Sequence, residues 1–246
     1  MRAEALVLVC GGDSGAASGP NQCGVYRRGG AGHIVHDVLE HLRELDELDG
    51  LLEDAIGRWD PDAPPPEGVV GGRYRQALRE ELERVATHPE YRAVADLPGA
   101  RRELDFVWLL GKGRELQGRI ALAGEREDGV VLLDVKTGAV ADLAAARRRA
   151  GSYAPQRDAY LRAVEAVARR PVAEFAFHFS RAGLQVAEQV SHELRNQAAG
   201  EMDTVLAGIE AGAKDVSAGW QECRFCGYKA ARWCRGAAAE GHRGVS

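Results

Sequence analysis

An apolar strand that ends in a carboxylate and an ammonium group is the feature that most constrains this chain. The run 130–135 continues into Lys136-Thr137-Gly138, so Asp134 and Lys136 stand two residues apart. In a strand, such residues point to the same face. A carboxylate there can hold a divalent cation, while an ammonium group can orient water or stabilise charge on a phosphate. The alternative interpretation is a strand-end ion pair followed by a Thr-Gly turn.

The order of helical and strand patterns predicts an α/β fold with a mixed sheet flanked by helices. The first thirty residues are rich in Gly, Ser and Ala and are interpreted as a loop-rich segment, and the prolines of 59–66 exclude a helix there. Asp128-Gly129 is a hairpin signal between two strands. The expected helices are 32–48, 73–87, 153–169 and 193–209, and the expected strands are 102–110, 115–123, 129–136, 172–180 and 184–190.

Further pieces of sequence on both sides of Asp134 form an ordered series. Gly32 and His36 open the first helix, Gly118-Arg119-Ile120 lies on the strand before Asp134, and Gln156 and Tyr160 are spaced to share one helix face. This series resembles the RecB-like PD-(D/E)xK nucleases, which include the nuclease domains of RecB and AddB and the CRISPR-associated adaptation nucleases.

The resemblance implies a restriction-endonuclease-like core and a role for each matching residue. His36 and Asp134 would be ligands of Mg²⁺ or Mn²⁺, and Lys136 would be the catalytic lysine. Gln156 and Tyr160 would position the site and the DNA. Glu103 matches a position that is commonly acidic in the family, and a solvated strand end is the alternative for it.

One position departs from the family pattern. The family has a metal-bridging aspartate after Gly-x-Ile, whereas this chain has Ala121. Because Mg²⁺ and Mn²⁺ prefer oxygen ligands, we expect weak metal binding without that carboxylate. The other motifs are intact, which favours an introduced substitution that traps substrate; a natural copy that has lost cleavage is the alternative.

Five cysteines, an odd number, argue against a disulfide framework. Cys223 and Cys226 form a Cys-x-x-Cys pair, with Cys234 eight residues further on, a pattern typical of a soft-ligand metal site. Several RecB-like nucleases bind a [4Fe–4S] cluster in this way, with the fourth cysteine before the first motif; Cys23 is favoured here over Cys10. Zinc held by Cys223, Cys226, Cys234 and His242 is the competing hypothesis. The expected division is a loop-rich segment 1–30, a nuclease core 31–215 and a cysteine-containing tail 216–246.

The net charge of −5 does not itself indicate a polyanionic partner, but basic residues are clustered. Solvated helix faces are the alternative to phosphate contacts for each cluster. Neither a membrane span nor a signal peptide is predicted from the sequence, so a cytoplasmic location is expected. The candidate DNA-contacting residues are Arg147, Arg148, Arg149, Arg224, Lys229 and Arg232.

These observations favour a metal-dependent DNA exonuclease or end-processing nuclease, impaired by Ala121. Its partners would be DNA ends or single strands, and, since no phosphate loop of a motor occurs in the sequence, any helicase would be a separate subunit. The alternative is a non-catalytic module, derived from the nuclease fold, that binds DNA ends or a helicase.

Overall fold

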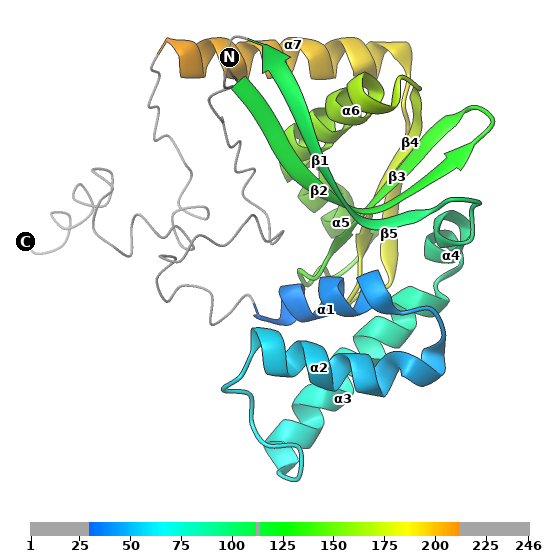
Figure 1. Cartoon of the computed structure of the whole chain (residues 1–246), viewed down its shortest axis with the longest axis vertical. Coiled ribbons are helices and arrows are strands. Elements are labelled where there is room, and N and C mark those ends of the chain that lie inside the picture. The colour runs from blue at the N-terminus through cyan, green and yellow to red at the C-terminus, as the bar shows by residue number, and fades with distance from the viewer. Residues whose placement is uncertain (1–29, 112–113, 212–246) are drawn as a thin grey trace, which may run out of the picture.

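The structure, a computed structural model, describes residues 30–111 and 114–211. Four α-helices precede strands β1 to β3, two helices then lead to β4 and β5, and a last helix follows (Figure 1). The helical elements are α1 (Gly30–His41), the short 3₁₀ helix η2 (Leu45–Glu47), α2 (Leu48–Trp59), α3 (Val69–Thr87), α4 (Pro89–Ala95), α5 (Leu143–Ser152), α6 (Ala154–Ala168) and α7 (His192–Glu210). The strands are β1 (Arg101–Gly111), β2 (Arg114–Arg126), β3 (Gly129–Lys136), β4 (Val172–Phe179) and β5 (Leu184–Gln189).

The strands form one mixed sheet in the order β1-β2-β3-β4-β5. Neighbouring strands are antiparallel except β3 and β4, which are parallel. A parallel pair needs a crossover connection, and helices α5 and α6 supply it. The predicted α/β class with a mixed sheet flanked by helices is therefore confirmed.

The hairpin between β2 and β3 forms at the expected turn. Arg126 pairs with Gly129 across it, and Gly129 has φ +148°, a conformation that L side chains rarely adopt. A Cβ at this position would also lie 2.4 Å from the carbonyl oxygen of Pro171. Glycine is required here for both reasons.

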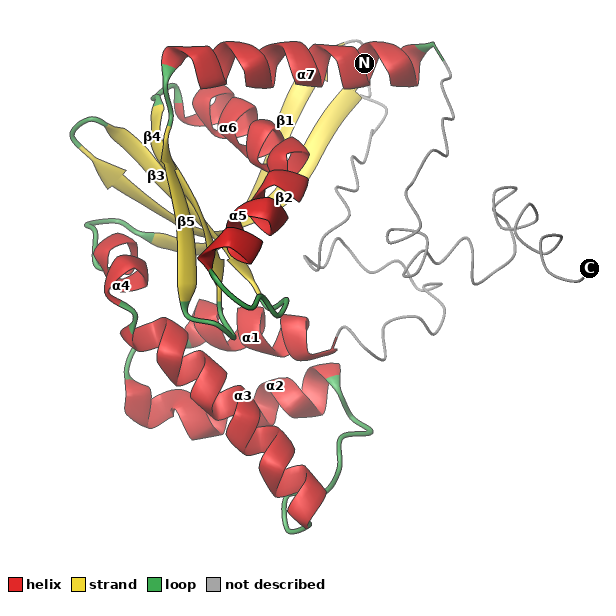
Figure 2. Cartoon of the chain, turned by 180° about the vertical axis from the view of Figure 1, so that it is seen from behind, coloured by secondary structure: helices red, strands yellow, loops and turns green. Residues whose placement is uncertain are grey.

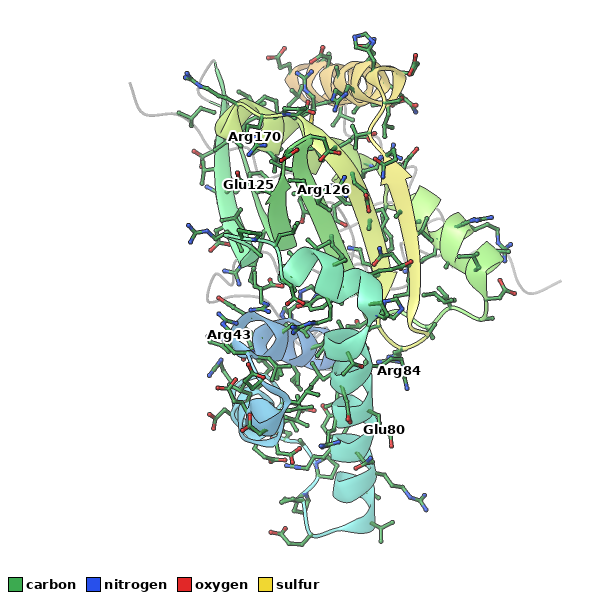
Figure 3. The ribbon with its side chains drawn as sticks, turned by 90° about the vertical axis from the view of Figure 1, so that its right-hand side faces the viewer. Arg43, Glu80, Arg84, Glu125, Arg126 and Arg170 are labelled. Carbon is green, nitrogen blue, oxygen red and sulfur yellow. The ribbon has the colours of Figure 1, made fainter. Side chains whose placement is uncertain are left out.

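Helices lie on both faces of the sheet (Figure 2), and each face has its own hydrophobic core. Residues of α1 to α4 pack on one face against Val131, Leu133 and Val135, whereas residues of α5 to α7 pack on the other against Val130 and Leu132. Strand β3 is buried along its whole length, as its continuous apolar run predicts. Figure 3 views the sheet from the α3–α4 side, with Glu80 and Arg84 on α3.

The sheet opens into a fork between β2 and β3. The last residue pair between these strands is Leu122↔Leu133, although β2 continues to pair with β1 as far as Arg114 and β3 continues to pair with β4 as far as Lys136. Figure 1 shows the β1–β2 hairpin leaning away from β3 and β4. Asp134 directly follows the point of divergence.

Three local predictions were wrong. The expected helix 32–48 ends at His41, because the Glu47 side chain accepts hydrogen bonds from the backbone N–H groups of Arg43 and Glu44 and a new helix starts at Leu48. The expected helix 73–87 begins earlier, at Val69. Helices α2, α4 and α5 were not predicted.

Within residues 30–111 and 114–211, no helix combines the length and apolar character needed to cross a membrane.

Candidate active site

Asp134 and Lys136 form a buried ion pair at the end of β3. Their side chains are 3% and 2% exposed, and Nζ of Lys136 lies 2.8 Å from Oδ2 of Asp134. The geometry is not that of a hydrogen bond, so this buried Oδ2 has a neighbouring positive charge but no hydrogen-bond donor among the described residues. A buried carboxylate oxygen in this state is suited to accept a cation.

A chain of hydrogen bonds fixes Lys136 from the opposite side. Its Nζ donates to Oε1 of Gln156 over 2.7 Å, and Nε2 of Gln156 donates to the hydroxyl of Tyr160 over 2.8 Å. The Tyr160 hydroxyl in turn donates to the carbonyl oxygen of Arg119 over 2.7 Å. The ring of Tyr153 lies beneath the ammonium group, 4.2 Å from Nζ to its centroid. Lysine is thereby held by α6 and by β2 at once.

Gly118 allows this arrangement because it leaves space for aromatic rings. A Cβ at this position would lie 2.6 Å from Cζ of Phe106 and 3.3 Å from Cε1 of Tyr160. These two rings meet edge to face, with centroids 5.7 Å apart. The glycine of the Gly118-Arg119-Ile120 motif therefore has a packing role, and the Arg119 carbonyl a hydrogen-bonding role.

His36, from the middle of α1, reaches the open edge of β3. Its Nδ1 lies 2.6 Å from Oε1 of Glu103 and its Nε2 lies 3.2 Å from the carbonyl oxygen of Val135. Carbonyls of consecutive strand residues point to opposite edges. The Lys136 carbonyl points toward β4, because it accepts from the backbone N–H of Ser180. The Val135 carbonyl therefore points to the other edge of β3, where β2 no longer pairs with it.

The surroundings of His36 favour its protonated form. Burial lowers the pKa of the imidazole, but the hydrogen bond to Glu103 and the charges of Glu103 and Asp134 outweigh burial and raise the pKa above its usual value. An imidazolium can donate from Nδ1 to Glu103 and from Nε2 to Val135. A metal ion would take the place of the Nε2 proton, so protons and metal would compete at this atom.

Ala121 lies at the fork, and its side chain is largely buried at 7% exposure. The β1–β2 register places it opposite Glu103, between the pairs Arg102↔Leu122 and Leu104↔Ile120. Counting one residue beyond the last β2–β3 pair places it opposite Asp134 as well. A carboxylate at this position would add an oxygen ligand next to Asp134, and a divalent cation stabilises two neighbouring carboxylates.

The residues present fit a divalent cation with an incomplete ligand set. Two ligands of Mg²⁺ in adjacent octahedral positions lie about 3 Å apart. The 3.2 Å between Nε2 of His36 and the Val135 oxygen has that spacing, and the Asp134 oxygen without a donor belongs to the residue directly before Val135. A carboxylate at position 121 would extend this ligand set.

Two other features of the same region do not contribute to this site. Asp37, Glu40 and His41 bring ligand atoms within 4.8 Å of one another on α1, but Asp37 already accepts hydrogen bonds from Arg58 and Trp59. A cavity of about 310 Å³ lies between the end of α1, α3, α4 and the start of β1. Its lining contains neither Asp134 nor Lys136.

The candidate DNA-contacting residues are only partly placed. Arg147, Arg148 and Arg149 are exposed on α5, and the Arg149 guanidinium lies 5.2 Å from the centroid of the Tyr153 ring. That ring also contacts Lys136, so α5 extends from the candidate site to the surface. Arg224, Lys229 and Arg232 lie outside the described residues, as do Cys10, Cys23, Cys223, Cys226, Cys234 and His242.

The sequence matches the profile described as "PD-(D/E)XK nuclease superfamily" over residues 17–235. The chain belongs to this superfamily. No curated protein matches the sequence. Similar solved structures include one named "Putative exonuclease" from Eubacterium rectale, with 13% identity, a TM-score of 0.49 and coverage of 92% of this chain and 77% of the other. Another is SSO0001, with 11% identity, a TM-score of 0.37 and coverage of 85% and 95%.

The fold brings His36, Glu103, Asp134, Lys136, Gln156 and Tyr160 into one connected region. Sequence reasoning missed the Tyr153 ring beneath Lys136 and the Arg119 carbonyl that accepts from Tyr160. No spacing in the sequence indicates that Tyr153 contacts Lys136. Gly118 could have indicated that another element packs closely against the backbone near Arg119.

Proposed function

We propose that this chain is a RecB-type, divalent-metal-dependent deoxyribonuclease of the exonuclease or end-processing kind. The observation that carries the proposal is the buried Asp134–Lys136 pair at the sheet fork, with the His36 imidazole beside it. Burying two charges is costly, so a buried pair at the position of the expected motif is a candidate functional site.

Each residue has a defined task in phosphodiester cleavage. Asp134, His36 through Nε2 and the Val135 carbonyl would hold Mg²⁺ or Mn²⁺, which supplies Lewis acidity toward a phosphate oxygen and activates water. Lys136 orients the attacking water and stabilises charge on the phosphate. Gln156 holds the ammonium group in place, and Tyr160 holds Gln156.

Position 121 limits the activity of this sequence. With alanine there, the site offers one carboxylate, one imidazole and one carbonyl. This set favours Mn²⁺ over Mg²⁺, because imidazole suits transition metals better. We propose that the chain binds DNA and cleaves it poorly until a carboxylate is present at position 121.

The test compares the chain with Ala121→Asp and with the uncharged control Ala121→Asn on end-labelled single- and double-stranded DNA. Reactions contain Mg²⁺ or Mn²⁺, with EDTA as the metal-free control. We expect cleavage by the aspartate variant alone, abolished by EDTA and by adding Lys136→Met. Absence of cleavage in the aspartate variant, with folding and DNA binding intact, would refute the enzyme proposal.

A second candidate function rests on the same alanine. A non-catalytic module that binds DNA ends or a helicase subunit needs the fold and the basic surface but not the bridging carboxylate. It predicts salt-sensitive DNA binding in every variant and cleavage in none.

The cysteines remain the basis of a separate proposal. Cys23, Cys223, Cys226 and Cys234 would hold a [4Fe–4S] cluster, and zinc held by the last three with His242 is the alternative. Anaerobic purification followed by iron, sulfide and zinc analysis distinguishes them. A protein free of all three would exclude both.

A further inference from the structure

The His36–Glu103 contact carries an inference that deepens the proposed function and rests on it. A neutral imidazole has one N–H and one lone pair, and the two can exchange places. Whichever nitrogen is to bind a metal must be the one without hydrogen. The partner of the other nitrogen therefore decides whether the residue is a competent ligand.

The two nitrogens of His36 have different surroundings. Nδ1 faces the Glu103 carboxylate at 2.6 Å, and that side chain is only 6% exposed. Nε2 faces the Val135 carbonyl at 3.2 Å, and the charge of the Asp134 carboxylate also acts on the ring. Both neighbours are acceptors, but only the shorter contact has the distance of a strong, charge-assisted hydrogen bond. In the neutral ring, the hydrogen therefore belongs on Nδ1 and the lone pair on Nε2.

The backbone at Glu103 is unusual in a way that supports a functional constraint. Its φ is +45°, whereas non-glycine residues in strands avoid positive φ. A conformation of this kind costs on the order of 1 kcal/mol or more and persists where the surroundings impose it. Here it occurs opposite Ala121 in the β1–β2 register, at the residue whose carboxylate reaches the α1 imidazole.

We propose that Glu103 is the positioning residue of the metal site, holding His36 as the Nδ1–H tautomer with Nε2 directed toward the cation position. Its negative charge also increases the basicity of the ligand nitrogen. It thereby compensates in part for the carboxylate that Ala121 lacks. Glu103 acts through His36 and does not itself touch the cation.

The first test needs neither metal nor DNA. Nitrogen-15 chemical shifts of the His36 ring, recorded at alkaline pH, distinguish the two neutral tautomers. We expect the Nδ1–H form in the parent protein and in Glu103→Gln, whose amide oxygen still accepts, and a mixture or the other tautomer in Glu103→Ala. The control is Asp105→Asn, which removes a carboxylate from the same strand, where Asp105 is 70% exposed and paired with Arg119.

The second test measures Mn²⁺ binding by electron paramagnetic resonance and calorimetry, in the Ala121→Asp background as well as in the parent. Loss of an outer carboxylate on a histidine ligand weakens metal binding about 10- to 100-fold. We expect that loss for Glu103→Ala, a smaller loss for Glu103→Gln and none for Asp105→Asn.

The outcomes separate this inference from the nuclease proposal. An unchanged His36 tautomer in Glu103→Ala, or unchanged Mn²⁺ affinity in a folded variant, would overturn the positioning role even if Ala121→Asp cleaves DNA. Conversely, a tautomer and an affinity that depend on Glu103, in a protein that cleaves nothing, would support the positioning role and remove the nuclease. Circular dichroism of each variant establishes that it is folded.

Discussion

Replacing Lys136 by methionine tests whether the ion pair at the end of β3 is truly buried. Methionine fills much of the lysine volume but leaves Asp134, whose side chain is 3% exposed, without its positive neighbour. Removal of one partner of a buried pair costs about 3–5 kcal/mol, because the remaining charge stays desolvated. We therefore expect the free energy of unfolding at neutral pH to fall by this amount in urea titrations followed by circular dichroism.

Two controls complete the design. Asp134→Asn combined with Lys136→Met removes both charges, so most of the loss should be restored. Arg92→Met breaks an exposed pair, in which Arg92 and Asp96 are 46% and 52% exposed, and should cost less than about 1 kcal/mol. A Lys136→Met loss no larger than that of Arg92→Met would refute the reasoning.

Three further predictions address packing, DNA binding and acid stability. Gly118→Ala places a Cβ within 2.6 Å of Phe106 and should lower the free energy of unfolding by about 1–3 kcal/mol. The control Gly200→Ala, where a Cβ would have no atom within 4 Å, should not lower it, and denaturant titrations measure both variants. Replacing Arg147, Arg148 and Arg149 by glutamine should reduce the slope of log K for DNA against log salt by up to about 3, and an unchanged slope would exclude α5 from the DNA path. Burial and the neighbouring His88 lower the pKa of His178 from 6.5 to about 4. Because a depressed folded pKa gives stability that is present above the unfolded pKa and lost as pH falls, the protein should lose about 3 kcal/mol between those pH values, and His178→Leu should flatten that dependence.

The strands and the sheet class could be predicted because their signals are local. The apolar run before Asp134, the Asp128-Gly129 turn and the spacing of Gln156 and Tyr160 each require only a few neighbouring residues. The missed helices also had local signals of lower contrast. Pro89 occupies the first turn of α4, and Asp142 caps α5 by accepting from the backbone N–H of Ala145.

The missed features of the candidate site depend on contacts that no local pattern specifies. Glu103 was expected at an acidic strand position, but its carboxylate meets His36 across 67 residues of sequence. The Tyr153 ring beneath Lys136 depends on how α5 and α6 dock on the sheet. The carbonyl of Val135 is open to His36 only because the part of β2 before Leu122 does not pair with β3.

The separation in sequence of the groups around the fork has a consequence for synthesis of the protein. His36 meets the Val135 carbonyl across 99 residues, and Gln156, which holds Lys136, follows a further 20 residues after it. Long-range contacts of this kind form late, since loop closure must precede them. During translation, helices α1 to α3 can pack together long before β3 leaves the ribosome. The proposed metal ligands can meet only after β3 has emerged, and Lys136 is fixed only after α6 has emerged, so a partly made chain cannot assemble the whole candidate site.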